Sequence, residues 1–125
     1  METLLTPLHR YVSAFNSRNA ELMASVFSPV LCTIHPGEPD VDVREAGPFL
    51  QRMQGLWPKN VRYQLRRFIT SGDLDAVGEV WGELLLLDAD SRPLASEVVL
   101  YRIREGLVSE ICVYKQMHPS HPDYQ

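Results

Sequence analysis

Cysteine and long apolar runs are both scarce in this sequence. Its two cysteines, Cys32 and Cys112, are too few for a disulfide framework or for a zinc site, which needs about four ligands. The longest apolar run is the four leucines from Leu84 to Leu87, far short of the roughly 20 residues that cross a bilayer. No basic segment precedes an apolar stretch at the N-terminus, as a signal peptide would require. We therefore expect no membrane association and a cytoplasmic location.

Basic residues are fewer than acidic residues. Twelve Lys and Arg stand against sixteen Asp and Glu, which gives a net charge of −4. The basic residues are scattered apart from Arg62, Arg66 and Arg67, whereas nucleic acid is usually bound by a concentrated basic face. The sequence also lacks a Ser-His-Asp arrangement, a P-loop and a dinucleotide-binding fingerprint. We expect no nucleic-acid partner, no bound metal and no cofactor.

What is present is an ordinary globular composition. The chain has 125 residues, of which 45% are hydrophobic and 22% charged. A chain of this length can bury roughly two-thirds of its unfolded surface in one core. No internal repeat or linker interrupts it, so we expect a single domain over residues 1–125.

The N-terminal part has helical periodicity. One apolar stripe recurs at spacings of four, three and four residues, formed by Leu4, Leu8, Tyr11 and Phe15. Thr3 or Thr6 is expected to cap this helix, and Pro7 suits its first turn because the missing N–H is unpaired there in any case.

Two further helices and one strand are predicted before residue 60. Asn19 is expected to cap a short second helix that ends at Pro29. Residues 30–35 have the pattern of a short strand, and residues 36–42 form a proline-rich, acidic loop. A third helix then runs to about Trp57 with its apolar residues on one side.

From residue 61 onward the apolar pattern has a period of two. It predicts four strands separated by short turns, at residues 61–71, 74–87, 94–104 and 107–117. Short turns between consecutive strands are typical of an antiparallel meander. Helices followed by strands indicate an α+β fold.

Alternation gives the predicted sheet two faces of different character. The face expected to pack on the helices carries Val61, Tyr63, Leu65, Ile69, Ala76, Gly78, Val80, Gly82, Leu84, Val98, Leu100, Ile111 and Val113. The other face is expected to carry Arg62, Gln64, Arg66, Glu79, Trp81, Glu83, Glu97, Val99, Tyr101, Glu110, Cys112, Tyr114 and Gln116. Because this second face mixes opposite charges with Trp81, Tyr101 and Tyr114, we predict that it forms the interface of a homodimer.

Three stretches of the chain resemble the nuclear-transport-factor-2-like (NTF2-like), SnoaL-like family. The family's opening pair of helices is similar to LHRYVSAFNSRNAELMASVF, its strand, loop and third helix to CTIHPGEPDVDVREAGPFLQRM, and its closing hairpin to REGLVSEICVYKQ. The resemblance implies a cone-shaped domain in which N-terminal helices pack on a strongly bent antiparallel sheet. The family includes ketosteroid isomerases, polyketide cyclases, epoxide hydrolases, dehydratases and non-enzymatic modules, so the fold alone implies no activity.

The resemblance also suggests candidate catalytic residues. His35 aligns with the carboxylate that shuttles a proton in the ketosteroid isomerases, and a histidine can both take and give a proton near neutral pH. Tyr11 falls where those isomerases place a tyrosine near the oxyanion, and Tyr63 is expected to point the same way from the first long strand. Each has a structural alternative: His35 bonded to the loop backbone, and core tyrosines with their hydroxyls satisfied at the edge.

Four other residues bear on a pocket. Gly78 and Gly82, four apart on one strand, indicate a bend or room for a ligand. Arg67 and Arg102 fall by alternation on the helix-facing side, where they could bind an anionic group. A local bulge that turns these arginines outward is the simpler expectation.

Three functions fit these residues. The first is a cofactor-free isomerase, cyclase or hydrolase acting on a small apolar molecule, with His35 as acid and base and Tyr11 or Tyr63 orienting the substrate. The second is a non-enzymatic module that binds an apolar ligand or a partner. The third is a structural dimer whose cavity is filled by its own side chains. The sequence does not decide whether the chain is an enzyme.

Overall fold

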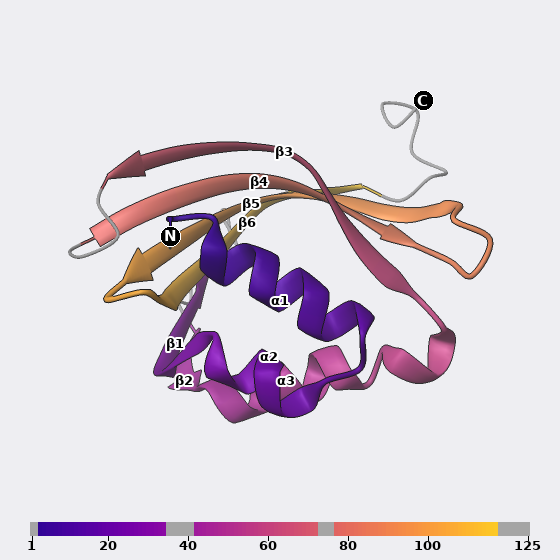
Figure 1. The fold of residues 1–125 in the computed structure, drawn as a ribbon, viewed down its shortest axis with the longest axis horizontal. Coiled ribbons are helices and arrows are strands. Elements are labelled where there is room, and N and C mark those ends of the chain that lie inside the picture. The colour runs from indigo at the N-terminus through magenta and orange to yellow at the C-terminus, as the bar shows by residue number, and fades with distance from the viewer. Residues whose placement is uncertain (1–2, 35–41, 73–76, 118–125) are drawn as a thin grey trace.

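The protein is seen in a computed structural model that describes residues 3–34, 42–72 and 77–117. Its elements are, in order, α1 (Thr6–Asn16), α2 (Ala20–Ser25), β1 (Phe27–Ile34), β2 (Asp42–Glu45), α3 (Ala46–Gln54), a short 3-10 helix η1 (Trp57–Lys59), β3 (Arg62–Gly72), β4 (Val77–Leu87), β5 (Pro93–Arg104) and β6 (Leu107–Met117). The strands form one curved sheet in the order β2-β1-β6-β5-β4-β3, and the helices lie on one of its faces (Figure 1). The predicted α+β fold, helices packed on a strongly bent sheet, is confirmed.

The meander from β3 to β6 is antiparallel throughout, as the period of two predicts. The remaining two strands depart from the prediction. β1 lies parallel to β6, and β2 pairs with β1 at the edge of the sheet, over residues that were expected to be loop and helix. A strand of four residues gives too short an alternation to be recognised in a sequence. No helix in the described parts of the chain is long and apolar enough to cross a membrane.

The helix ends follow the sequence only in part. Asn19 caps α2 as predicted, because its Oδ1 accepts a hydrogen bond of 3.0 Å from the backbone N–H of Leu22. The prediction for α1 is wrong, since Leu5 holds the capping position without a side-chain hydrogen bond. Thr3 and Thr6 instead bond to each other, with the N–H of Thr3 donating to the Thr6 hydroxyl at 2.8 Å.

Proline does not end the second helix. α2 stops at Ser25, and Pro29 lies within β1, where the register between β1 and β6 shifts between Phe27 and Cys32. Since proline donates no ladder hydrogen bond, such an interruption is where a strand tolerates it. The third helix also ends early, at Gln54, and Trp57 begins the separate turn η1.

The predicted faces are right for β4 and for Glu110 to Tyr114 of β6, and wrong for β5. Val99 pairs with Gly82 and Tyr101 with Val80, so these β5 residues face the helices, together with Glu97 and Ile103. Val98 and Leu100 lie on the outer face, where Glu97 and Tyr101 had been expected. Residues 98–101 are apolar or aromatic in both phases of the alternation, so apolarity alone did not distinguish the two faces.

A bulge explains the error on β3. Leu65 pairs with Leu84 but Arg67 pairs with Glu83, so the extra residue between them reverses the alternation of the strand. Ile69 consequently lies on the outer face, contrary to prediction, with 71% of its surface exposed. The same bulge turns Arg67 outward, which confirms the simpler expectation for that residue. Arg102 also lies outside, ion-paired with Glu79 and Glu110.

Candidate functional site

A pocket of about 340 Å³ lies between the inner face of the sheet and helices α1 and α3. Its lining is mostly apolar and aromatic, and consists of Tyr11, Phe49, Arg52, Met53, Leu56, Tyr63, Leu84, Leu86, Glu97, Val99, Tyr101, Ile111 and Val113. Three tyrosines and two charged residues are the polar groups of this lining. A volume of this size and a mainly apolar wall with a few polar groups are typical of small-molecule sites.

Aromatic packing fixes two of the tyrosines. The ring of Tyr11, from α1, lies 5.3 Å from that of Phe27 in an edge-to-face arrangement and 6.3 Å from that of Tyr63. The ring of Phe15, one helical turn further along α1, lies 4.7 Å from that of Tyr63. All four rings are buried, so neither tyrosine can turn away from the pocket without breaking this cluster.

Asn16 fixes the backbone of Tyr63. Its Nδ2 donates a hydrogen bond of 2.8 Å to the carbonyl of Tyr63, and its Oδ1 accepts one of 2.7 Å from the N–H of the same residue. The amide thereby ties the last residue of α1 to the start of the edge strand β3. It takes the place that a neighbouring strand would hold, and sets where the phenol of Tyr63 enters the pocket.

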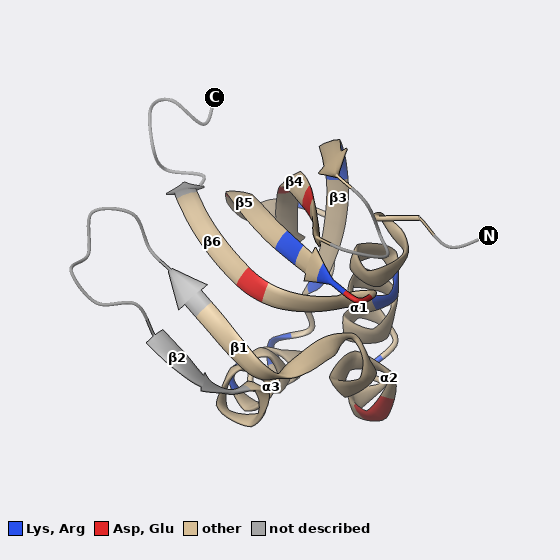
Figure 2. Cartoon of the chain, turned by 90° about the vertical axis from the view of Figure 1, so that its left-hand side faces the viewer, with Lys and Arg blue, Asp and Glu red and all other residues tan. Residues whose placement is uncertain are grey.

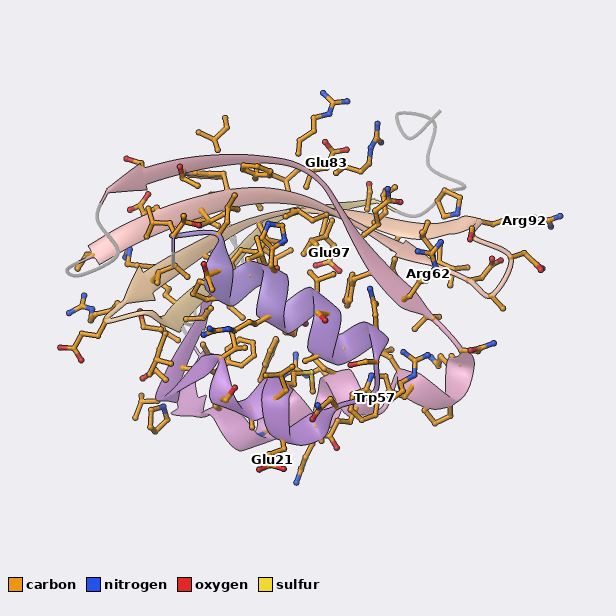
Figure 3. All side chains as sticks on the ribbon, in the orientation of Figure 1. Glu21, Trp57, Arg62, Glu83, Arg92 and Glu97 are labelled. Carbon is orange, nitrogen blue, oxygen red and sulfur yellow. The ribbon has the colours of Figure 1, made fainter. Side chains whose placement is uncertain are left out.

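Glu97 brings a carboxylate to the same face. In Figure 3 it points from the sheet toward the helices, whereas Glu83 lies on the opposite side of the sheet. Its negative charge acts on all three pocket tyrosines. Burial, and to a lesser degree this charge, raise the pKa of Tyr11, of Tyr63 and of Tyr101 above the ordinary value for tyrosine.

The chemical consequence is a site with separate donors and an acceptor. At neutral pH a tyrosine is protonated in any case, and the raised pKa values keep the three phenols protonated at alkaline pH as well, so each can donate a hydrogen bond. The carboxylate of Glu97 can accept a hydrogen bond or a proton. Arg52 contributes an exposed cation from α3. Among the described residues, no three His, Cys, Asp or Glu side chains are grouped so that they could hold a metal ion.

Of the three predicted site residues, the structure places two. Tyr11 and Tyr63 both line the pocket, and their rings lie side by side. His35 lies outside the described residues. Glu97 and Tyr101 are the polar groups that the sequence analysis placed on the wrong face. Arg102 and Arg104 share the phase of Val98 and Leu100, and this charge pattern was the signal that the phase faces outward.

The two glycines of β4 do not line the pocket. A Cβ at Gly78 would collide with the side chain of Leu4, and one at Gly82 would lie 3.3 Å from the Leu65 side chain and 3.6 Å from that of Leu8. They therefore make room for α1 to approach the sheet, and the expectation that they accommodate a ligand is not supported. Trp57 likewise packs in the core, with its ring 6.2 Å from that of Phe15.

Comparison with solved structures shows the same fold in proteins of very different sequence. A proposed ketosteroid isomerase from Kribbella flavida is 17% identical over 95% of this chain and 81% of its own, with a TM-score of 0.70. A proposed polyketide cyclase from Xanthomonas campestris is 13% identical over 90% of this chain and 89% of its own, with a TM-score of 0.60. An NTF2-like protein of unknown function from Burkholderia pseudomallei is 15% identical over 91% of each chain, with a TM-score of 0.63. No protein-family model and no curated protein matches the sequence.

Proposed function

We propose that this chain, which has the NTF2-like fold, binds a small, largely apolar molecule that carries a neutral polar group. The observation that carries the proposal is the pocket itself, in which Glu97 stands among three protonated phenols within a mainly apolar wall. The apolar side chains contribute affinity by excluding water from the ligand. The tyrosines and Glu97 orient its hydroxyl or carbonyl group.

The charge of Glu97 sets which ligands are accepted. It already disfavours the ionised form of each neighbouring phenol, and it disfavours an anionic ligand group at the same place for the same reason. A hydroxyl can donate to the carboxylate and accept from a phenol, whereas a carboxylate can only accept. An alcohol is therefore the better ligand than the acid of the same skeleton.

Cofactor-free acid–base catalysis on such a ligand is the second candidate function. Its support is the pairing of a carboxylate, which can take a proton, with phenols that can donate to a developing oxyanion. The names of two structural neighbours, an isomerase and a cyclase, are compatible with it. The role proposed for His35 as an acid and base belongs to this second function.

A thermal-shift screen of steroid-like and terpene-like alcohols and ketones tests the binding proposal, because a ligand that binds only the folded state raises the melting temperature. Two variants of β4 make a matched pair. Leu86→Trp places a bulky group in the pocket and should abolish the shifts. Val77→Trp, on the same strand but exposed and away from the pocket, should leave them unchanged. Shifts that survive Leu86→Trp, or no shift with any compound, would contradict the proposal.

A further inference from the structure

Arg52 interrupts an apolar stripe that faces the pocket. Phe49 and Met53 of α3, and Leu56 just after the helix, line the pocket at spacings of four and three residues. Residues at such spacings lie on one side of a helix. Arg52 lines the pocket with them and follows Phe49 by three residues, so it projects from the same side of α3. A cation thus stands where the stripe would otherwise continue with apolar side chains.

Arg52 lies at the opening of the pocket. It is exposed, whereas every other residue of the lining is buried or half-buried, and the three tyrosines are buried. The phenols therefore occupy the inner part of the pocket and the guanidinium group its solvent-facing part. Figure 2 shows α3 across the molecule from β5, the strand that carries Glu97, so the two charged residues enter the pocket from opposite walls.

The guanidinium group of Arg52 is available to a ligand. Three arginines on the outer face of the sheet are held by glutamates of the same chain. Within the described parts of the chain, by contrast, no carboxylate lies within ion-pair distance of Arg52. A guanidinium group is planar and can donate two parallel hydrogen bonds to one carboxylate. At the opening, a bound anion keeps part of its hydration, so it loses less solvation energy there than it would deeper in the apolar pocket.

We infer that the ligand is a hydroxy acid or a keto acid, with an anionic group such as a carboxylate bound by Arg52 at the opening. This inference rests on the binding function proposed above and adds a second polar group to its ligand. The hydroxyl or carbonyl group meets the tyrosines and Glu97 inside, and the negative charge of Glu97 keeps the carboxylate away from that end. The two charges therefore orient the ligand in one direction.

An acid without a hydroxyl or carbonyl group can also reach Arg52. It then leaves the phenols inside the pocket without a ligand partner, so it binds less tightly than the alcohol of the same skeleton. Tight binding requires both ends of the ligand.

Calorimetric titration with ω-hydroxydecanoate and with its methyl ester tests this inference. The two compounds share the apolar chain and the hydroxyl group, and at neutral pH they differ in the charge of the other end. The chain is flexible, so it can adapt to the span between the inner phenols and the opening. The wild type should bind the acid about two- to fivefold more tightly than the ester at low salt, which is the effect expected of an exposed ion pair. Added salt should reduce this preference, because it screens exposed charges.

Variants of Arg52 assign the preference to this residue. Arg52→Met removes the charge and keeps a long, unbranched side chain, so it should abolish the preference for the acid and leave the affinity for the ester unchanged. Arg52→Glu should reverse the preference, because it places a like charge at the opening. Lys59→Met is the matched control: it removes an exposed positive charge from the neighbouring turn η1, outside the pocket lining, and should keep the preference of the wild type.

The outcomes separate this inference from the proposed function. Equal binding of acid and ester by the wild type, or a preference for the acid that survives Arg52→Met, would overturn the inference and leave the binding of neutral ligands intact. Failure of both probes to bind, while alcohols of the thermal-shift screen do bind, would also overturn it, because a pocket with an anion site should retain the hydroxy acid. Failure of every compound to bind would contradict the proposed function itself.

Discussion

The inner and outer faces of strands β3 to β6 accommodate charged side chains in different ways. On the inner face, Glu97 and Tyr101 of β5 meet phenols and apolar side chains around a pocket. On the outer face, Arg102 of the same strand meets two carboxylates on the strands beside it. The charges outside are paired in the plane of the sheet, whereas Glu97 inside lines a pocket together with three tyrosines. The inner face is the one on which the proposed small-molecule site depends, and a homodimer interface on the outer face stays a prediction from the sequence.

The largest expected difference between the faces is in stability. Ile103→Ala removes a fully buried side chain of the inner face and should lower the free energy of unfolding by about 2–5 kcal/mol. Ile69→Ala makes the same change on the outer face and should cost less than about 0.5 kcal/mol, because that side chain is already 71% exposed. Urea unfolding measures both. Equal losses would show that the two faces are not divided as described.

The side-chain amide of Asn16 is expected both to stabilise the folded state and to position Tyr63 at the pocket. Asn16→Ala leaves the N–H and C=O of Tyr63 without their partner and should cost about 1–3 kcal/mol, measured by urea unfolding. It should also reduce ligand-induced thermal shifts, because Tyr63 is no longer held at the pocket. Asn19→Ala removes the cap of α2 at a cost of about 1 kcal/mol and should leave those shifts unchanged. Identical effects of both variants on ligand binding would refute the positioning role of Asn16.

Alkaline pH should weaken the folded state through the pocket tyrosines. Their pKa values are raised by burial, so above about pH 10 the unfolded chain loses protons that the folded chain retains. Stability therefore falls as pH rises, by about 1.4 kcal/mol per pH unit for each buried tyrosine. Tyr101→Phe should reduce the total loss between pH 9 and 11 by about 1.4 kcal/mol when the free energy of unfolding is measured in urea at each pH. A slope unchanged by the substitution would mean that Tyr101 ionises normally in the folded state.

The smallest expected effects come from the ion pairs outside. Arg102→Met leaves Glu79 and Glu110 without the arginine between them and should cost up to about 1 kcal/mol. Arg67 is the more exposed of the two arginines that pair with Glu83, and Arg66 remains when it is replaced. Arg67→Met should therefore change the free energy of unfolding by less than about 0.3 kcal/mol. Thermal unfolding at low salt compares the two. A larger cost for Arg67→Met would reverse the ranking of these pairs.

The fold was predictable because its main signals are local and repeated. A period of two over four long segments, separated by short turns, identified β3 to β6, and the apolar stripe with Tyr11 identified α1. The parallel pairing of β1 with β6 was not predictable. It joins segments about 80 residues apart, and the apolar pattern of neither segment indicates its partner strand. Nor was β2, which has only four residues.

The site was only half predictable, for a related reason. Tyr11 and Tyr63 were found because helix and strand periodicity place them toward the core. Glu97 and Tyr101 were missed because the residues from Val98 to Tyr101 are apolar or aromatic in both phases. Pairing with the neighbouring strand decides which residues of a strand face inward. Here Val99 pairs with Gly82, which faces the helices, so Val99 faces them too. The bulge after Leu65 misled the prediction for Ile69 in the same way.

The central claim is that Glu97 faces the pocket and governs which ligands enter it. Calorimetric titration of one alcohol found in the screen, and of the carboxylic acid with the same skeleton, measures this directly in the wild type and in Glu97→Gln. The account predicts that the wild type binds the alcohol at least tenfold more tightly than the acid, and that Glu97→Gln reduces this preference while it remains folded. Equal affinity of the wild type for the two ligands, or a preference unchanged by Glu97→Gln, would contradict it.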